Sequence, residues 1–351
     1  MRRASRRALD AAGKEQTGVA PQAVARLRIP SESAIRGFQS EVRNPKSEIA
    51  IHRFAVFTAI STLCLIVAGG LVTSTESGLS VPDWPLSYGR LMPPMVGGVF
   101  YEHGHRMIAT FVGVLTVVLA VWLARREPRR WVRNLGWAAL AAVVAQGVLG
   151  GLTVLLLLPT AVSVAHACLA QVFLCATVAL AVVTSPAWIE GSLAKGDPVA
   201  KAAAWASGAV FVQLLVGALM RHTKAGLAIP DFPLSLGRVV PPLDSFPVAI
   251  AFAHRAGAVL VAAFILVVAA RAFRSGRPGL AKGAGWLLFL VVAQIGLGAL
   301  TVLSRKAVPL TTAHVATGAL LLASTVALGL ASLRKPVAPK QPIGTLEVAW
   351  Q

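Results

Sequence analysis

The sequence has few charged side chains, and most of those are basic. Only 13% of its 351 residues are charged, and 14 acidic residues stand against 33 lysines and arginines. Soluble domains carry about 25% charged residues, so this content, 56% hydrophobic residues and a mean hydropathy of +0.71 exclude an ordinary soluble protein and predict a membrane protein. The basic residues form short clusters between apolar runs and no basic domain, so no nucleic-acid partner is expected.

Cysteine is scarce, with three residues in the whole chain. Cys64, Cys168 and Cys175 all fall inside apolar segments. A disulfide in a loop or a thiolate metal site is therefore not expected, and we interpret the cysteines as small packing residues.

Residues 1–53 contain no sustained apolar run. They lack the apolar centre of a cleavable signal, and acidic residues interrupt any transit-peptide pattern. We interpret this region as a basic, disordered cytoplasmic tail.

Eight apolar segments are long enough to span a bilayer, which takes about 20 residues each. They cover approximately residues 54–73, 99–124, 134–157, 162–184, 202–221, 248–271, 283–303 and 310–332. Lysines and arginines gather between segments 2 and 3, between segments 6 and 7, and after segment 8. Because such residues collect on the cytoplasmic side, we expect a multi-pass protein of the cell inner (plasma) membrane with both termini in the cytoplasm.

The chain contains an internal repeat with a spacing of 148 or 149 residues. The run GLSVPDWPLS that starts at Gly78 matches GLAIPDFPLS, which starts at Gly226, and His105-Arg106 matches His254-Arg255. Such a repeat predicts an all-α fold of two tandem four-helix bundles, related by a pseudo-twofold axis along the membrane normal. The expected bundles cover residues 54–184 and 202–332, with a cytoplasmic linker at 185–201 and a cytoplasmic tail at 333–351.

Four histidines recur at the spacing of the repeat: His105 and His166 in the first half, and His254 and His314 in the second. All four are expected near the outer ends of their helices. Ionisable residues inside a membrane are costly and mark functional sites, and facing helices of a bundle can ligate a haem iron through two imidazoles. The alternative is that each histidine is a polar residue at a helix end, bonded to a neighbour or to interfacial water.

Glu102 distinguishes the two halves, because its counterpart is Ala251. A carboxylate at one of two similar sites suggests proton-coupled chemistry there and a fixed cofactor at the other. Glu102 could instead stabilise the start of its helix through the helix dipole. Arg106 and Arg255 suit haem propionates, although interfacial anchoring fits them equally well.

Taken together, these motifs resemble the haem A synthase family. The resemblance covers about residues 54–332 and depends on Gly78-Leu79-Ser80, Pro82-Asp83-Trp84-Pro85, Glu102-x-x-His105-Arg106, His166, His254-Arg255 and His314. It implies oxidation of the methyl group of haem O to a formyl group. It also implies haem b bound by His254 and His314, and haem O received near His105 and His166 with Glu102 in turnover.

The same resemblance implies a haem O synthase and an electron donor as partners, and a homo-oligomer is a further expectation. The loop at 74–98 lacks the cysteine pair that many bacterial members carry, so the chain resembles a cysteine-free subgroup. A dihaem cytochrome b that only transfers electrons explains the four histidines equally well, but it gives no reason for the single carboxylate. A transporter with histidine proton relays would contain no haem.

Overall fold

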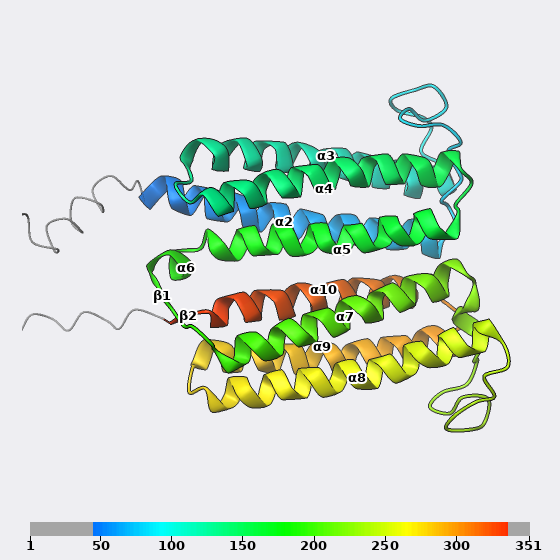
Figure 1. The fold of residues 1–351 in the computed structure, drawn as a ribbon. Helices are drawn as coiled ribbons and strands as arrows, with labels where there is room; N and C mark the ends of the chain where they lie inside the picture. Colours follow the sequence, from blue (N-terminus) through cyan, green and yellow to red (C-terminus); the bar gives the residue numbers. More distant parts are fainter. Residues whose placement is uncertain (1–44, 336–351) are drawn as a thin grey trace, which may run out of the picture. The chain divides into compact units, whose positions relative to one another are not determined.

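The computed structural model describes residues 45–335, and residues 1–44 and 336–351 lie outside the described part. The described part contains eight long helices that are apolar enough to cross a membrane, which confirms the predicted all-α membrane fold with eight spans (Figure 1). Their bounds are α2 (Pro45–Ser74), α3 (Gly98–Arg126), α4 (Arg130–Leu155), α5 (Thr160–Val183), α7 (Pro198–His222), α8 (Phe246–Arg274), α9 (Pro278–Leu303) and α10 (Val308–Ser332).

The first helix begins earlier than its apolar run. It starts at Pro45, so the disorder expected for residues 1–53 is wrong for residues 45–53; the rest of the expected tail lies outside the described residues. Ile51 is buried in the core, and Nδ1 of His52 lies 2.9 Å from the carbonyl oxygen of Ala181. Packing and this hydrogen bond extend the helix past the point where its hydrophobicity falls.

Helix starts follow local sequence signals. Proline occupies the first turn of α7, α8, α9 and α10, where its missing N–H costs nothing. Asp197 also caps α7 through hydrogen bonds from the backbone N–H groups of Val199 and Ala200, as expected for an aspartate at this position.

The helices pack as two sets of four. In the first bundle (α2, α3, α4 and α5) each helix contacts its two neighbours in a closed ring, and the second bundle (α7, α8, α9 and α10) has the same pattern. The bundles meet where α2 and α5 contact α10, and where α5 contacts α7. This packing agrees with the expected tandem arrangement, while the exact pseudo-twofold relation stays a prediction.

The linker between the bundles contains the short helix α6 (Pro186–Glu190) and the strand β1 (Ser192–Leu193). β1 pairs antiparallel with β2 (Arg334–Lys335), Ser192 opposite Lys335. Two residues beyond α10 are thereby tied to the linker.

Two long loops lie at the other end of the helices (Figure 1). The first loop (residues 75–97) joins α2 to α3, and the second loop (residues 223–245) joins α7 to α8 and contains the 3-10 turn η1 (Ala225–Leu227). Since His105, His166, His254 and His314 all lie within the first nine residues of their helices, the loops and the histidines occupy the same end.

Candidate functional site

The second bundle brings the rings of His254 on α8 and His314 on α10 together in its interior. Their ring centroids are 6.4 Å apart, and the ring planes meet at 74°. A metal–imidazole bond is about 2.0 Å long, and a five-membered ring with bonds of about 1.35 Å has a radius of about 1.1 Å. Two imidazoles on opposite sides of one metal ion therefore have centroids about 6.3 Å apart, so this pair fits a shared haem iron.

Each of the four histidine rings lies against a glycine of a neighbouring helix. A Cβ atom added at Gly69, Gly150, Gly217 or Gly298 would lie 2.9–3.2 Å from Cε1 of His105, His166, His254 or His314, respectively. We call these four residues the ring-contact glycines. Any side chain at these positions would displace a histidine, so the backbone is shaped around the rings.

The Nδ1 atoms of the second pair have polar partners. The amide Nε2 of Gln213 lies 3.1 Å from Nδ1 of His254 and donates to the carbonyl oxygen of the same residue at 2.7 Å. Nδ1 of His314 lies 3.2 Å from the carbonyl oxygen of Gln294. The carbonyl oxygen beside His314 can accept its Nδ1–H, which leaves Nε2 free for a metal. The Gln213 amide is a donor, and it holds His254 in place through the carbonyl oxygen of that residue.

The first pair is held less firmly. His105 and His166 lie within electrostatic reach of each other, but Nδ1 of each is buried without a hydrogen-bond partner in the described chain. The backbone carbonyls of Leu65 and Gln146 lie nearby but form no hydrogen bond with these Nδ1 atoms. Leu65 occupies the position of Gln213 in the repeat, so the amide contact is missing from the first bundle.

Arg106 and Arg255 bind the two loops. Arg106 donates to the carbonyl oxygens of Asp83 and Leu86, each at 2.8 Å, and Arg255 donates to those of Leu234 and Asp231, each at 2.7 Å. The terminal nitrogens of both arginines thus donate hydrogen bonds to loop carbonyl oxygens. Binding of haem propionates by these arginines stays a prediction.

Glu102 is buried, with 4% of its surface exposed, and both of its carboxylate oxygens accept hydrogen bonds. Oε2 accepts the backbone N–H of Val81 at 2.9 Å, and Oε1 accepts Nη2 of Arg106 at 2.7 Å. Glu102 therefore links α3 to the first loop at the level of the first histidine pair.

Each loop contains an aspartate that closes a tight turn. Asp83 accepts the backbone N–H groups of Tyr88 at 2.6 Å and Gly89 at 2.8 Å, and Asp231 accepts those of Leu236 and Gly237, both at 2.8 Å. These bonds lower the pKa of both aspartates, with the glycine N–H as the largest cause. Both carboxylates therefore stay charged at neutral pH.

The aromatic residue of the first loop packs against α4 next to the first histidine pair. The indole of Trp84 lies against Gly151 of α4, where an added Cβ would approach Cδ2 to 2.6 Å. Gly151 is next to Gly150, which contacts His166. This contact holds the first loop against α4 beside the first histidine pair.

Two further histidines, His103 and His222, belong to this region. His103 is buried, and its Nδ1 lies 2.8 Å from the hydroxyl of Ser87, which also accepts Nη1 of Arg106 at 3.4 Å. His222 at the end of α7 lies within electrostatic reach of His166. The signal for His103 was available, because its counterpart in the second half is Phe252.

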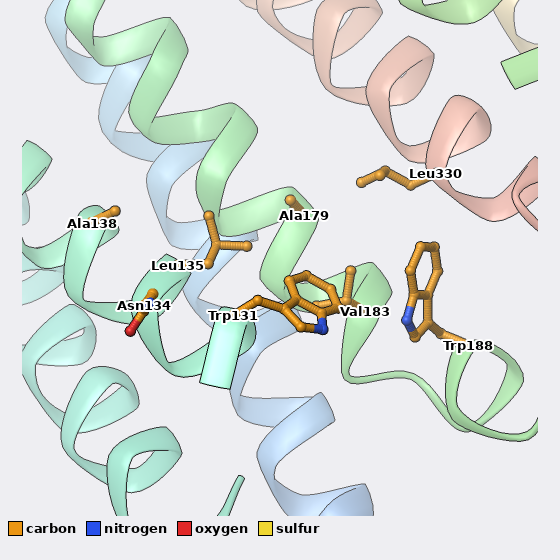
Figure 2. A pocket seen from close by; sticks show the side chains of 8 residues that line it. All are labelled: Trp131, Asn134, Leu135, Ala138, Ala179, Val183, Trp188 and Leu330. Carbon is orange, nitrogen blue, oxygen red and sulfur yellow. The ribbon is translucent and has the colours of Figure 1, made fainter. Parts of the chain in front are cut away.

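An apolar hollow lies at the opposite end of the helices, where α4 begins and α5 ends. Figure 2 shows its lining side chains: Trp131, Asn134, Leu135, Ala138, Ala179, Val183, Trp188 and Leu330. Its lining has no ionisable side chain, so it is separate from the histidine site.

Comparison with known proteins identifies the family. The family described as "Cytochrome oxidase assembly protein" matches residues 52–97 and 96–326, which include both loops and all four histidines. The chain belongs to this family.

Related members of the family include the "Heme A synthase" proteins of three bacteria. The protein of Symbiobacterium thermophilum is 35% identical over 256 residues, which cover 69% of this chain and 82% of the relative. That of Shouchella clausii is 28% identical over 270 residues, with 73% and 88% covered. That of Sphingopyxis alaskensis is 30% identical over 328 residues, with 79% and 90% covered.

Proposed function

We propose that this protein is a haem A synthase, a membrane oxidoreductase that oxidises the methyl group of haem O to the formyl group of haem A. The observation that carries the proposal is the opposed pair His254–His314, whose spacing of 6.4 Å fits a haem iron, in a chain of this family. Haem O is the substrate, and haem A the product for terminal oxidases.

We assign haem b, the resident cofactor, to the second bundle, where His254 and His314 are its ligands. The support is the contact of both Nδ1 atoms with polar partners, because a fixed ring favours tight, lasting ligation. Bound haem b would supply a redox-active iron that exchanges electrons with the first site.

The first bundle is the proposed substrate site, with haem O near His105 and His166. The Nδ1 atoms of both histidine rings have no hydrogen-bond partner among the described residues. Loosely held rings suit a bound porphyrin that must leave after each turnover. Gly69 and Gly150 leave room for the two rings, so the site keeps the shape of the second one without its rigidity.

Glu102 is proposed to act as a fixed negative charge beside the substrate. Because both of its oxygens already accept hydrogen bonds, this geometry favours stabilising positive charge that develops at the oxidised carbon over carrying a proton. Its second role is to position the first loop through Val81.

The rival function, a dihaem cytochrome b that only transfers electrons, is not favoured by the family match. It also leaves the buried Glu102–Arg106 pair of the first bundle unexplained. The transporter alternative is not favoured either, because it assigns no role to the metal-spaced pair His254–His314.

The protein is a multi-pass membrane protein, and we propose the plasma membrane as its location, with both termini in the cytoplasm. The support for this orientation is the basic cluster at Arg125, Arg126, Arg129, Arg130 and Arg133, on the side away from the histidines. A haem O synthase and an electron donor are the proposed partners, and a homo-oligomer is the proposed assembly.

Extraction of haem from the purified protein tests the function. In cells that supply haem O, we expect the extract to contain haem A and haem b. The variant Glu102→Gln keeps the side-chain shape and should retain haem b while its haem A yield falls at least about 10-fold, by the loss of one charged interaction. Haem b alone from the unaltered protein would establish the electron carrier instead, and a normal haem A yield from Glu102→Gln would remove Glu102 from the mechanism.

A further inference from the structure

Arg221, in the last turn of α7, is a half-buried cation at the junction of the two bundles. Its Nη2 donates to the hydroxyl of Ser74 at 2.8 Å and to the carbonyl oxygen of Gly70 at 3.3 Å, both on α2. These partners are neutral. Within residues 45–335, no carboxylate forms an ion pair with Arg221. A charge inside a membrane segment is costly unless an opposite charge compensates it, so Arg221 is suited to an anionic ligand.

The position of Arg221 on α7 directs it toward the second histidine pair. Gln213, Gly217 and Arg221 are spaced four residues apart and therefore share one face of the helix. Gln213 and Gly217 both contact His254, and Arg221 lies one turn further toward the loops. Arg221 is also within electrostatic reach of His314.

A second contact ties Arg221 to α10. The hydroxyl of Thr312 donates to the hydroxyl of Ser74 at 3.1 Å, and Thr312 is two residues before His314. The hydroxyl of Ser74 on α2 thereby joins Arg221 of α7 to Thr312 of α10. The Nη1 and Nε groups of Arg221 have no acceptor among the described residues, which leaves donors for a carboxylate.

The other arginines near the histidines are less suited to this role. Arg106 and Arg255 donate to loop carbonyl oxygens through both terminal nitrogens. The first bundle has Thr73 in place of Arg221, so the cation belongs to the second site alone.

We propose that Arg221 binds a carboxylate of the tetrapyrrole held by His254 and His314, an inference that depends on the proposed haem site of the second bundle. The ligand class is a porphyrin with free acid side chains. Because its partners lie on α2, Arg221 would also fix that carboxylate relative to the first bundle. The phosphate of an anionic lipid has similar chemistry, and the experiment below separates it from the porphyrin.

The test compares ferric protohaem with its dimethyl ester, in which both carboxylates are blocked. Haem-free full-length protein with His105→Ala and His166→Ala, which leaves only the second site able to ligate through two histidines, is titrated with each compound and followed by the Soret absorbance. We expect this parent to prefer the free acid by roughly 10- to 100-fold, the range of a hydrogen-bonded charge. In Arg221→Gln, the preference for the free acid over the ester should fall to the small difference that the different solubilities of the two compounds cause. Arg221→Lys should keep part of the preference.

Ser74→Ala is the matched control, because it removes the 2.8 Å contact of Arg221 but keeps the cation. It should leave the preference near that of the parent. An unchanged preference in Arg221→Gln would overturn the proposal, and if the same variant also lost phosphatidylglycerol bound from vesicles, the ligand would be a lipid. If the parent bound neither compound with a bis-histidine spectrum, the proposed haem site itself would fail, and this inference with it.

Discussion

Gln213 offers the sharpest test of how the two histidine pairs differ. Its amide contacts Nδ1 of His254 at 3.1 Å and donates to the carbonyl oxygen of His254 at 2.7 Å. Gly257 leaves room for this amide, since an added Cβ would lie 2.2 Å from Oε1 of Gln213. We therefore expect Gln213→Leu, which introduces the residue of the first bundle, to loosen His254 as an iron ligand.

The expected size of the effect follows from two estimates. Each neutral hydrogen bond contributes about 0.5–1.5 kcal/mol, so losing both costs roughly 1–3 kcal/mol, or about 5- to 150-fold in affinity. Loss of a residue that orients a metal ligand typically costs about 10- to 100-fold. Both estimates place the rise in the haem dissociation constant of the second site near 10- to 100-fold.

The assay is the rate at which excess apomyoglobin removes haem from the purified protein, measured together with the reduction potential of the bound haem. A faster rate and a shifted potential are expected for Gln213→Leu. Leu65→Gln is the matched variant in the first bundle and should slow the loss of haem from that site. If Gln213→Leu changed neither the rate nor the potential, the contact with Nδ1 would have no part in holding the cofactor.

Two further predictions concern the ring-contact glycines and the first loop. Gly217→Ala should displace His254 and reduce bound haem b, measured by pyridine haemochrome. The control Gly208→Ala on the same helix meets nothing within 4 Å and should retain full haem content. For Asp83, a pKa lowered in the folded state means that its stabilisation is complete above the unfolded pKa and is lost as the pH falls through the folded value. The fluorescence of Trp84, taken as the difference from Trp84→Phe, should thus be constant between pH 8 and 5 and change only below pH 3.8. A transition at higher pH would contradict this, and Asp83→Asn should abolish it.

The eight helices could be predicted because long apolar runs have few other structures in a membrane. The prediction was weakest at helix ends, where packing replaces hydrophobicity; the start of α2 at Pro45 instead of residue 54 is the clearest example. The four histidines could be found because the repeat places them twice at nearly one spacing.

The partners of these histidines were harder to predict. Nothing in the local sequence of Arg106 indicates that a loop more than 15 residues earlier folds back onto it. The sequence contains 31 glycines, and nothing local marks the four ring-contact glycines among them. Only the repeat spacing, as between Gly69 and Gly217, points to these positions. Gln213 carries no repeat signal, because its counterpart in the first half is Leu65.

The ring-contact glycines also bear on how a duplicated gene could acquire two roles. Both copies keep a glycine beneath each imidazole, so a side chain there would displace a histidine ring in either half. Around these shared glycines the two halves carry different residues: Leu65 corresponds to Gln213, Thr73 to Arg221, and Glu102 to Ala251. One copy could therefore specialise in retention and the other in turnover by independent changes, without either half first giving up what the ancestor already did.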